Sequence, residues 1–167
     1  EETIYNYING CNIKTFVQNN NFTNIFDVGF GPGLGLFYLQ ECFPMADINY
    51  YSIEIDPILI DWAIHHTLKN EIIDVQKHDL YIKFKFKNIN VLILIGDARK
   101  TLPVAISQDL FLPIHAIFQD PFSPKKNPTL WTIEWFKLLK SISHPEVLIS
   151  TYSSSVSIRK SMIEAGF

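Results

Sequence analysis

The sequence predicts an α/β protein of Rossmann-like, doubly wound type, in which helices cover both faces of a mostly parallel sheet. Three observations predict this fold. Short apolar runs alternate with helical segments, the first apolar run leads directly into a glycine-rich loop, and three apolar runs end at an acidic residue. In an open α/β sheet the carboxyl ends of the strands form the edge where ligands bind, so these acidic residues are candidates for a binding site.

The order of the elements follows from these patterns. Helices are expected over residues 8–18, 57–68 and 156–165, from residue 36 onward, and from near Thr132. Strands are expected over residues 25–28, 48–55, 81–87, 91–95, 115–119 and 147–151. The start of the helix over 57–68 is the best defined, because Pro57 suits the first helical position and Asp56 suits the N-cap.

Residues 81–87 alternate between apolar and mostly basic side chains. Ile82, Phe84 and Phe86 face one way. The other face carries Tyr81, Lys83, Lys85 and Lys87. A period of two predicts a half-buried strand, which we expect to form a hairpin through Asn88 with the strand that follows. The lysines are either a solvated face or a phosphate-binding stripe that is independent of sequence.

The first strand ends at Asp27, which is followed by four glycines at alternate positions: Gly29, Gly31, Gly33 and Gly35. Glycines let the chain turn sharply and bring backbone N–H groups close to a ligand. The spacing does not match the Gly-x-Gly-x-x-Gly fingerprint of dinucleotide-binding proteins. A carboxylate at Asp27 would repel a pyrophosphate, but it suits the ammonium and sulfonium groups of S-adenosylmethionine (SAM). The alternative is a glycine-rich turn that binds no ligand.

Two later strands also end in carboxylates. Glu54 lies about 20 residues after the glycines, where an acidic side chain can accept hydrogen bonds from both hydroxyls of a ribose. Asp97 follows the apolar run over 91–95 and suits either an adenine amino group or a helix N-cap. Three acidic strand ends in this order resemble the class I SAM-dependent methyltransferases. The strand pair that ends the sheet of that class is missing, and the chain begins without methionine, so we expect residues 1–167 to be a single, incomplete methyltransferase domain.

Composition excludes several other classes of protein. With 167 residues, 47% of them hydrophobic, the chain can bury one core. A net charge of −3 gives no overall basic surface, so any RNA contact must be local, and neither DNA nor a membrane is expected as a partner. Cys11 and Cys42 form no metal motif, the five histidines show no ligand spacing, and no secretory segment is present. We therefore expect a cytoplasmic protein without a metal.

The loop after the strand over 115–119 is the predicted catalytic region. Asp120 begins it, and three prolines stiffen it. An alkylamine of pKa about 10 is mostly protonated at neutral pH and then has no lone pair for attack. A carboxylate here would orient the amine and favour loss of its proton, with nitrogen and methyl carbon about 3–3.5 Å apart. The alternative is that Asp120 only caps the turn.

Other residues of this loop suggest RNA contacts. Phe122 is expected to be exposed and to stack on a base, whereas Trp131 and Trp135 are expected to pack the following helix. Lys125 and Lys126 suit phosphate groups, although a pair of loop lysines is more often only solvated.

The run over 120–132 reads Asp-Pro-Phe-Ser-Pro-x-x-Asn-Pro-x-x-Trp-Thr and resembles the MnmC-type tRNA methyltransferase family. Residues 1–5, the glycine loop, and residues 96–98, 151–153 and 159–167 extend the resemblance over essentially the whole chain. It implies methyl transfer from SAM to 5-aminomethyl-(2-thio)uridine at the tRNA wobble position, with Asp120 beside the amine. Bifunctional members also carry a flavin-dependent oxidase domain, and no FAD domain is found here. Many members of that family have Asp-Gly-Phe-Ala-Pro and Gly-Thr-Gly-Leu-Asn at two of these places, so the resemblance implies a divergent branch.

Three alternatives share parts of the pattern. A spermidine-synthase-like aminopropyltransferase also combines a glycine loop with an aspartate at a strand end. An N6-adenine methyltransferase would have an Asp-Pro-Pro-Tyr-like loop at Asp120, but the second proline and the tyrosine are absent. A SAM-fold protein that binds RNA or a partner without turnover is the non-enzymatic alternative.

Overall fold

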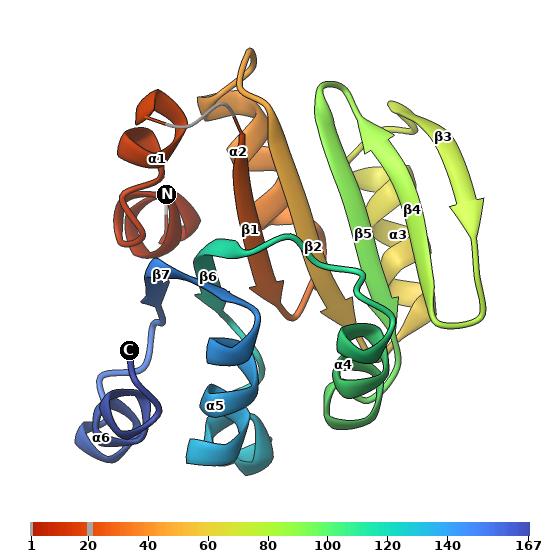
Figure 1. Cartoon of the computed structure of the whole chain (residues 1–167). Coiled ribbons are helices and arrows are strands. Elements are labelled where there is room, and N and C mark those ends of the chain that lie inside the picture. Colours follow the sequence, from red (N-terminus) through yellow and green to blue (C-terminus); the bar gives the residue numbers. More distant parts are fainter. Residues whose placement is uncertain (1, 20–21) are drawn as a thin grey trace.

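The computed structural model describes residues 2–19 and 22–167, and within them one mixed sheet of seven strands forms the centre of the molecule (Figure 1). The strand order is β3-β4-β5-β2-β1-β6-β7. The strands are β1 (Thr23–Val28), β2 (Ile48–Glu54), β3 (Ile72–Lys77), β4 (Tyr81–Phe86), β5 (Ile89–Ile95), β6 (Ile114–Gln119) and β7 (Ser143–Ser150). The helices are η1 (Ile4–Asn9), α1 (Ile13–Asn19), α2 (Leu34–Cys42), α3 (Pro57–His66), α4 (Ala98–Ser107), η2 (Pro128–Trp131), α5 (Ile133–Ser141) and α6 (Val156–Glu164).

The predicted fold class is confirmed. Strands β5, β2, β1, β6 and β7 pair in parallel, whereas β3 and β4 are antiparallel additions at one edge. The predicted hairpin joins β4 to β5, and its alternation places Ile82, Phe84 and Phe86 in the core. The parallel strands therefore end at a common edge, and the loops that follow β1, β2, β5 and β6 lie there.

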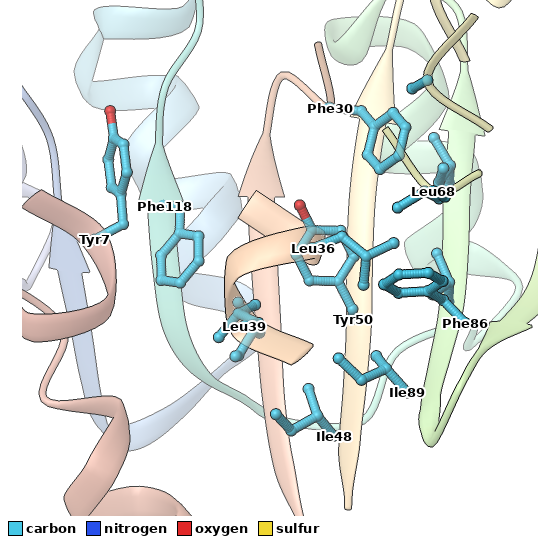
Figure 2. Packing of buried hydrophobic residues seen from close by; sticks show 14 of the residues in the cluster. Tyr7, Phe30, Leu36, Leu39, Ile48, Tyr50, Leu68, Phe86, Ile89 and Phe118 are labelled. Atoms are coloured by element: carbon cyan, nitrogen blue, oxygen red, sulfur yellow. The ribbon is translucent and has the colours of Figure 1, made fainter. Parts of the chain in front are cut away.

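Helices pack on both faces of the sheet and create two layers of core (Figure 1). On one face α2, α3 and η1 cover the sheet, and Figure 2 shows Leu36 and Leu39 packed beside Tyr50 there. On the other face α4, α5 and α6 contribute side chains such as Leu102 and Phe136. The core strands are buried on both sides, which explains why apolar residues follow one another in them instead of alternating with polar ones, most clearly in β5.

Several elements differ from the prediction, including α4 and η2, which were not among the expected helices. The expected helix over 8–18 is broken, because η1 ends at Asn9 and α1 begins only at Ile13 after Asn12 adopts a φ of 49°. Strand β3 was not predicted, since its residues are mostly exposed and lack a clean alternation. Strand β7 begins at Ser143, four residues earlier than expected. Within the described ranges, no helix is long and apolar enough to cross a membrane.

Candidate functional site

A cavity of about 420 Å³ opens at the carboxyl edge of the parallel strands. It brings together seven of the residues singled out from the sequence: Asp27, Gly29, Gly31, Glu54, Asp97, Asp120 and Phe122. Gly33, Lys125 and Lys126 are not among its lining residues. Side chains that are far apart along the chain therefore meet in one site, as the strand order predicted.

The glycine loop between β1 and α2 needs glycine for its backbone. Gly29, Gly31 and Gly33 have φ angles of 99°, 53° and 77°, a region that disfavours other residues. Gly29 also passes close to the catalytic loop, because a Cβ there would lie 3.1 Å from the backbone oxygen of Asp120. This approach joins the predicted cofactor loop to the predicted catalytic loop.

The carboxylate of Glu54 holds the glycine loop at the end of β2. Its Oε2 accepts a hydrogen bond from Gly31 N at 2.9 Å, and its Oε1 accepts one from Asp56 N at 3.1 Å. Each carboxylate oxygen keeps a second lone-pair direction. The side chain thus fixes the loop and still faces the cavity, so the ribose role predicted for Glu54 is compatible with its place.

Asp27 is buried at the end of β1, with 4% of its surface exposed. Tyr50 Oη donates a hydrogen bond to Asp27 Oδ2 from the neighbouring strand. Burial raises the pKa of Asp27 well above its usual range, and the hydrogen bond from Tyr50 opposes that shift while the charges of Asp120 and Glu54 add to it. Of the residues that the structure describes, four acidic ones line the cavity against one basic one, Arg99, so the site suits a cationic ligand.

Asp97 lies at the rim and caps a helix. Its Oδ1 accepts from Arg99 N at 3.1 Å at the start of α4, and its Oδ2 pairs with Arg99 Nη2 at 2.8 Å. The hydrogen bond from the Arg99 side chain lowers the pKa of Asp97. The N-cap alternative is therefore confirmed, and a contact with an adenine amino group stays a prediction.

Asp120 follows β6 and faces the cavity beside Tyr7. Tyr7 Oη donates a hydrogen bond to Asp120 Oδ1 at 2.6 Å. Partial burial raises the pKa of Asp120, the bond from Tyr7 lowers it, and the charge of Glu2 raises it. Within residues 2–19 and 22–167, no backbone N–H donates to this carboxylate, so the structure does not support a role for Asp120 as a turn cap.

Three side-chain hydrogen bonds hold the loop after Asp120, two of them from buried residues. Gln119 Nε2 donates to the Leu130 carbonyl at 2.6 Å, and Trp131 Nε1 donates to the Phe122 carbonyl at 3.1 Å. Tyr152 Oη donates to the Pro121 carbonyl at 3.0 Å. Trp131 and Trp135 are buried as predicted, and Thr132 is the N-cap of α5.

The loop presents an exposed ring above this framework. Phe122 is 71% exposed, and Lys126 Nζ lies 5.8 Å from the centre of its ring. Lys125 is exposed as well. An exposed aromatic ring at the mouth of a cavity can stack on a base, and the lysine beside it can contact a phosphate.

Sequence reasoning missed three tyrosines of the site: Tyr7, Tyr50 and Tyr152. Each donates a hydrogen bond to a residue at least 23 positions away in the chain. No local motif marks such contacts. The place of Tyr50 on a core strand beside β1 was the one available signal.

The residues present fit SAM. Gly29 and Gly31 leave room for close approach of a ligand, the acidic residues of the lining suit its cationic groups, and apolar side chains such as Ile55 and Leu59 line the rest of the cavity. Among the described residues, no cluster of three or more His, Cys, Asp or Glu side chains could hold a metal ion.

Comparison with known proteins agrees with this geometry. A family model described as S-adenosyl-L-methionine-dependent methyltransferase matches residues 62–167. The tRNA 5-methylaminomethyl-2-thiouridine biosynthesis bifunctional protein MnmC of Pseudomonas putida (strain GB-1) is 31% identical over 158 residues, which cover 84% of this chain and 23% of that protein. The protein of the same name from Pseudomonas syringae pv. tomato is 32% identical with the same coverage. This chain thus spans about a quarter of the length of the curated relatives it matches.

Solved structures show the same fold. MNMC2 from Aquifex aeolicus superposes with a TM-score of 0.76 at 28% identity, over 99% of this chain and 54% of that one. Human methyltransferase-like protein 13 in complex with SAH superposes with a TM-score of 0.53 at 16% identity, over 86% of this chain and 60% of that one. At that identity the human protein supports the fold alone.

Proposed function

Because this chain belongs to the S-adenosyl-L-methionine-dependent methyltransferase family, we propose that it methylates the amine of 5-aminomethyl-(2-thio)uridine at the wobble position of tRNA, giving 5-methylaminomethyl-(2-thio)uridine. The observation that carries the proposal is the carboxylate of Asp120 at the mouth of the cavity that also holds the glycine loop. The likeness to MnmC proteins and to MNMC2 supports the tRNA substrate. We further propose that the described fold is one methyltransferase domain acting in the cytoplasm, where Cys11 and Cys42 stay free thiols.

We assign the cofactor site to the strand ends and the glycine loop. SAM supplies an electrophilic methyl group on a sulfonium. Asp27 and Glu54 would face the cationic and ribose parts of such a ligand, and Gly29 and Gly31 line the cavity where it would approach. Gly33 lies behind them and supplies the left-handed turn that shapes the loop. Asp97 completes this set at the rim.

We assign the chemistry to Asp120. Its carboxylate accepts a proton from the aminomethyl group and holds the nitrogen so that the freed lone pair points to the methyl carbon. The raised pKa of Asp120 makes it a stronger base than an aspartate of ordinary pKa. Phe122, Lys125 and Lys126 would receive the anticodon loop, whose unpaired bases are presented at little energetic cost.

The relatives do not favour the aminopropyltransferase alternative. A probable spermidine synthase from Corynebacterium glutamicum shares the fold, with a TM-score of 0.54, but at 16% identity it supports nothing beyond the fold. A catalytic test still separates the two reactions, because they use different donors and different amines.

The experiment is methyl transfer from labelled SAM by the full-length protein. Separate reactions contain tRNA with 5-aminomethyluridine, unmodified tRNA, and putrescine with decarboxylated SAM. We expect label only in the aminomethylated tRNA, and loss of transfer with retained SAM binding in Asp120→Ala. Asp47→Ala, an exposed aspartate just before β2, is the matched control. Aminopropyl transfer to putrescine, or SAM binding without any transfer, would contradict the proposal.

A further inference from the structure

Tyr7 lies on an unusual element of the structure. It belongs to η1, a π-helix over Ile4–Asn9 that directly precedes the break at Gly10. π-Helices are rare in proteins and frequently occur at functional sites. The tyrosine is 4% exposed, although its hydroxyl reaches the cavity of the candidate active site.

Several contacts fix η1 against the end of the sheet. Ser150 Oγ donates a hydrogen bond to the Asn6 carbonyl from the end of β7. Gly10 permits this approach, because a Cβ there would lie 2.6 Å from Ser150 Oγ. Cys11 Sγ contacts the carbonyls of Ile117 at 3.4 Å and Leu148 at 3.7 Å. The segment from η1 to Cys11 is therefore held by β6, which leads directly into Asp120, and by its neighbour β7.

The ring of Tyr7 packs against β6, the strand that leads into Asp120. It packs on Phe118 with ring centres 5.4 Å apart and an interplanar angle of 34°, and Figure 2 shows the two rings side by side. Phe118 is two residues before Asp120, and Tyr7 Oη reaches Asp120 Oδ1 at 2.6 Å. No described residue donates a hydrogen bond to Asp120 Oδ2.

We propose that Tyr7 is a positioning residue for the methyl-transfer reaction, and that its hydroxyl holds Oδ1 of Asp120 so that an ionised Oδ2 faces the substrate nitrogen. The proposal deepens the proposed function and rests on it. A fixed carboxylate loses less orientational freedom when the amine binds, which is how a residue without contact to the reacting atoms can raise a rate.

Tyr7 acts only as a donor in this pair. Its burial and the neighbouring Asp120 raise its pKa far above the usual value, so the hydroxyl keeps its proton at any working pH. The bond stabilises the charged form of Asp120 against the burial that disfavours it. The titratable groups around Asp120 lie at the N-terminal end, on β1, on β2 and after β7: Tyr7, Glu2, Asp27, Tyr50 and Tyr152.

The test compares wild type with Tyr7→Phe, which keeps the ring and removes the donor. The Asp120 carboxyl carbon is assigned by NMR with Asp120→Asn and followed against pH in the full-length protein. Loss of the hydrogen bond should raise the Asp120 pKa, and the acid limb of kcat/KM should move to higher pH by the same amount. We expect roughly tenfold lower kcat/KM at neutral pH, as for the loss of a hydrogen bond to a charged group. The affinity for SAM should be unchanged.

Two further variants keep the test decisive. Tyr5→Phe is the matched control, because Tyr5 lies on the same helix and is 76% exposed. Ser150→Ala loosens η1 without altering Tyr7 and should shift the titration of Asp120 in the same direction by less. An Asp120 titration that is unchanged in Tyr7→Phe, or equal activity losses at every pH, would overturn the proposal. The NMR titration needs no substrate, so it distinguishes this failure from a failure of the proposed function.

Discussion

Tyr50 donates a hydrogen bond to the buried carboxylate of Asp27 across the β1–β2 pair. Ser52 Oγ also donates to the Asp27 carbonyl at 2.8 Å, so β2 holds both the side chain and the main chain of this residue. An acidic group is thereby kept where burial disfavours its charge. Such an arrangement lowers stability and fits a site whose ligand brings the missing positive charge.

The first prediction concerns Asp27→Asn. Because the folded protein raises the Asp27 pKa above the ordinary value of about 4, the free energy of unfolding of the wild type should fall as pH rises through the folded pKa. The asparagine variant has no carboxyl group to ionise at this position, so its free energy of unfolding does not show this decrease. We expect its stability relative to wild type to increase from pH 4 to pH 7 in urea denaturation, while calorimetry shows weaker SAM binding.

The exposed Asp47→Asn supplies the control, and its stability relative to wild type should not depend on pH. If the stability difference between Asp27→Asn and wild type stays constant with pH, Asp27 is not the source of the pH dependence of the free energy of unfolding.

Gly35→Ala is expected to destabilise the protein although it lies within helix α2. Alanine ordinarily stabilises a helix by about 1 kcal/mol relative to glycine. Here a Cβ would lie 2.6 Å from Asp27 Oδ2 and 3.0 Å from Tyr50 Oη. Overpacking of this kind costs about 1–3 kcal/mol, which chemical denaturation would measure. In an Asp27→Ala background the closest clash is gone, and the same substitution should become neutral or stabilising. A stabilising effect in the wild-type background would contradict the packing described around Asp27.

The sequence predicted the parts of this fold that depend on local pattern. The core strands are apolar runs such as residues 91–95, and the strand-end carboxylates lie where chain order brings them together. Strand β3 could not be predicted from the sequence, because its side chains are mostly exposed and its register with β4 shifts between Ile73 and Gln76. The break after η1 could not be predicted either, because the spacing of apolar residues does not show that Asn12 adopts a left-handed φ.

The candidate site divides in the same way. Asp27 and Asp120 were visible because each stands at the end of an apolar run. The partners that set their charge were not, because Tyr50 and Tyr7 reach them from 23 and 113 residues away. Long-range hydrogen bonds of this kind depend on the assembled sheet, and a single sequence holds no local sign of them.

Trp131→Phe should loosen the loop that follows Asp120. The substitution removes the hydrogen bond from Trp131 Nε1 to the Phe122 carbonyl and weakens the edge contact with Tyr152, whose ring centre lies 6.0 Å away. We expect about 1 kcal/mol lower stability by denaturation and a lower kcat for methyl transfer. Trp135→Phe is the matched control, since its indole N–H bonds Gln119 at 3.3 Å inside the core. It should cost similar stability with a smaller effect on kcat; equal losses of kcat would argue against a role specific to the loop.

Phe122→Ala tests the exposed ring at the mouth of the cavity. A side chain that is 71% exposed contributes little to folding, so stability should stay within about 0.5 kcal/mol of wild type. Stacking on a base is worth about 1–3 kcal/mol, which predicts a KM for tRNA at least fivefold higher, whereas Phe122→Tyr should keep wild-type kinetics. Steady-state kinetics at several salt concentrations separate stacking from charge. Lys126→Ala should flatten the salt dependence if Lys126 contacts a phosphate, and Phe122→Ala should leave that slope unchanged. An unaltered KM in Phe122→Ala would exclude stacking by this ring and move the base-binding surface elsewhere on the rim.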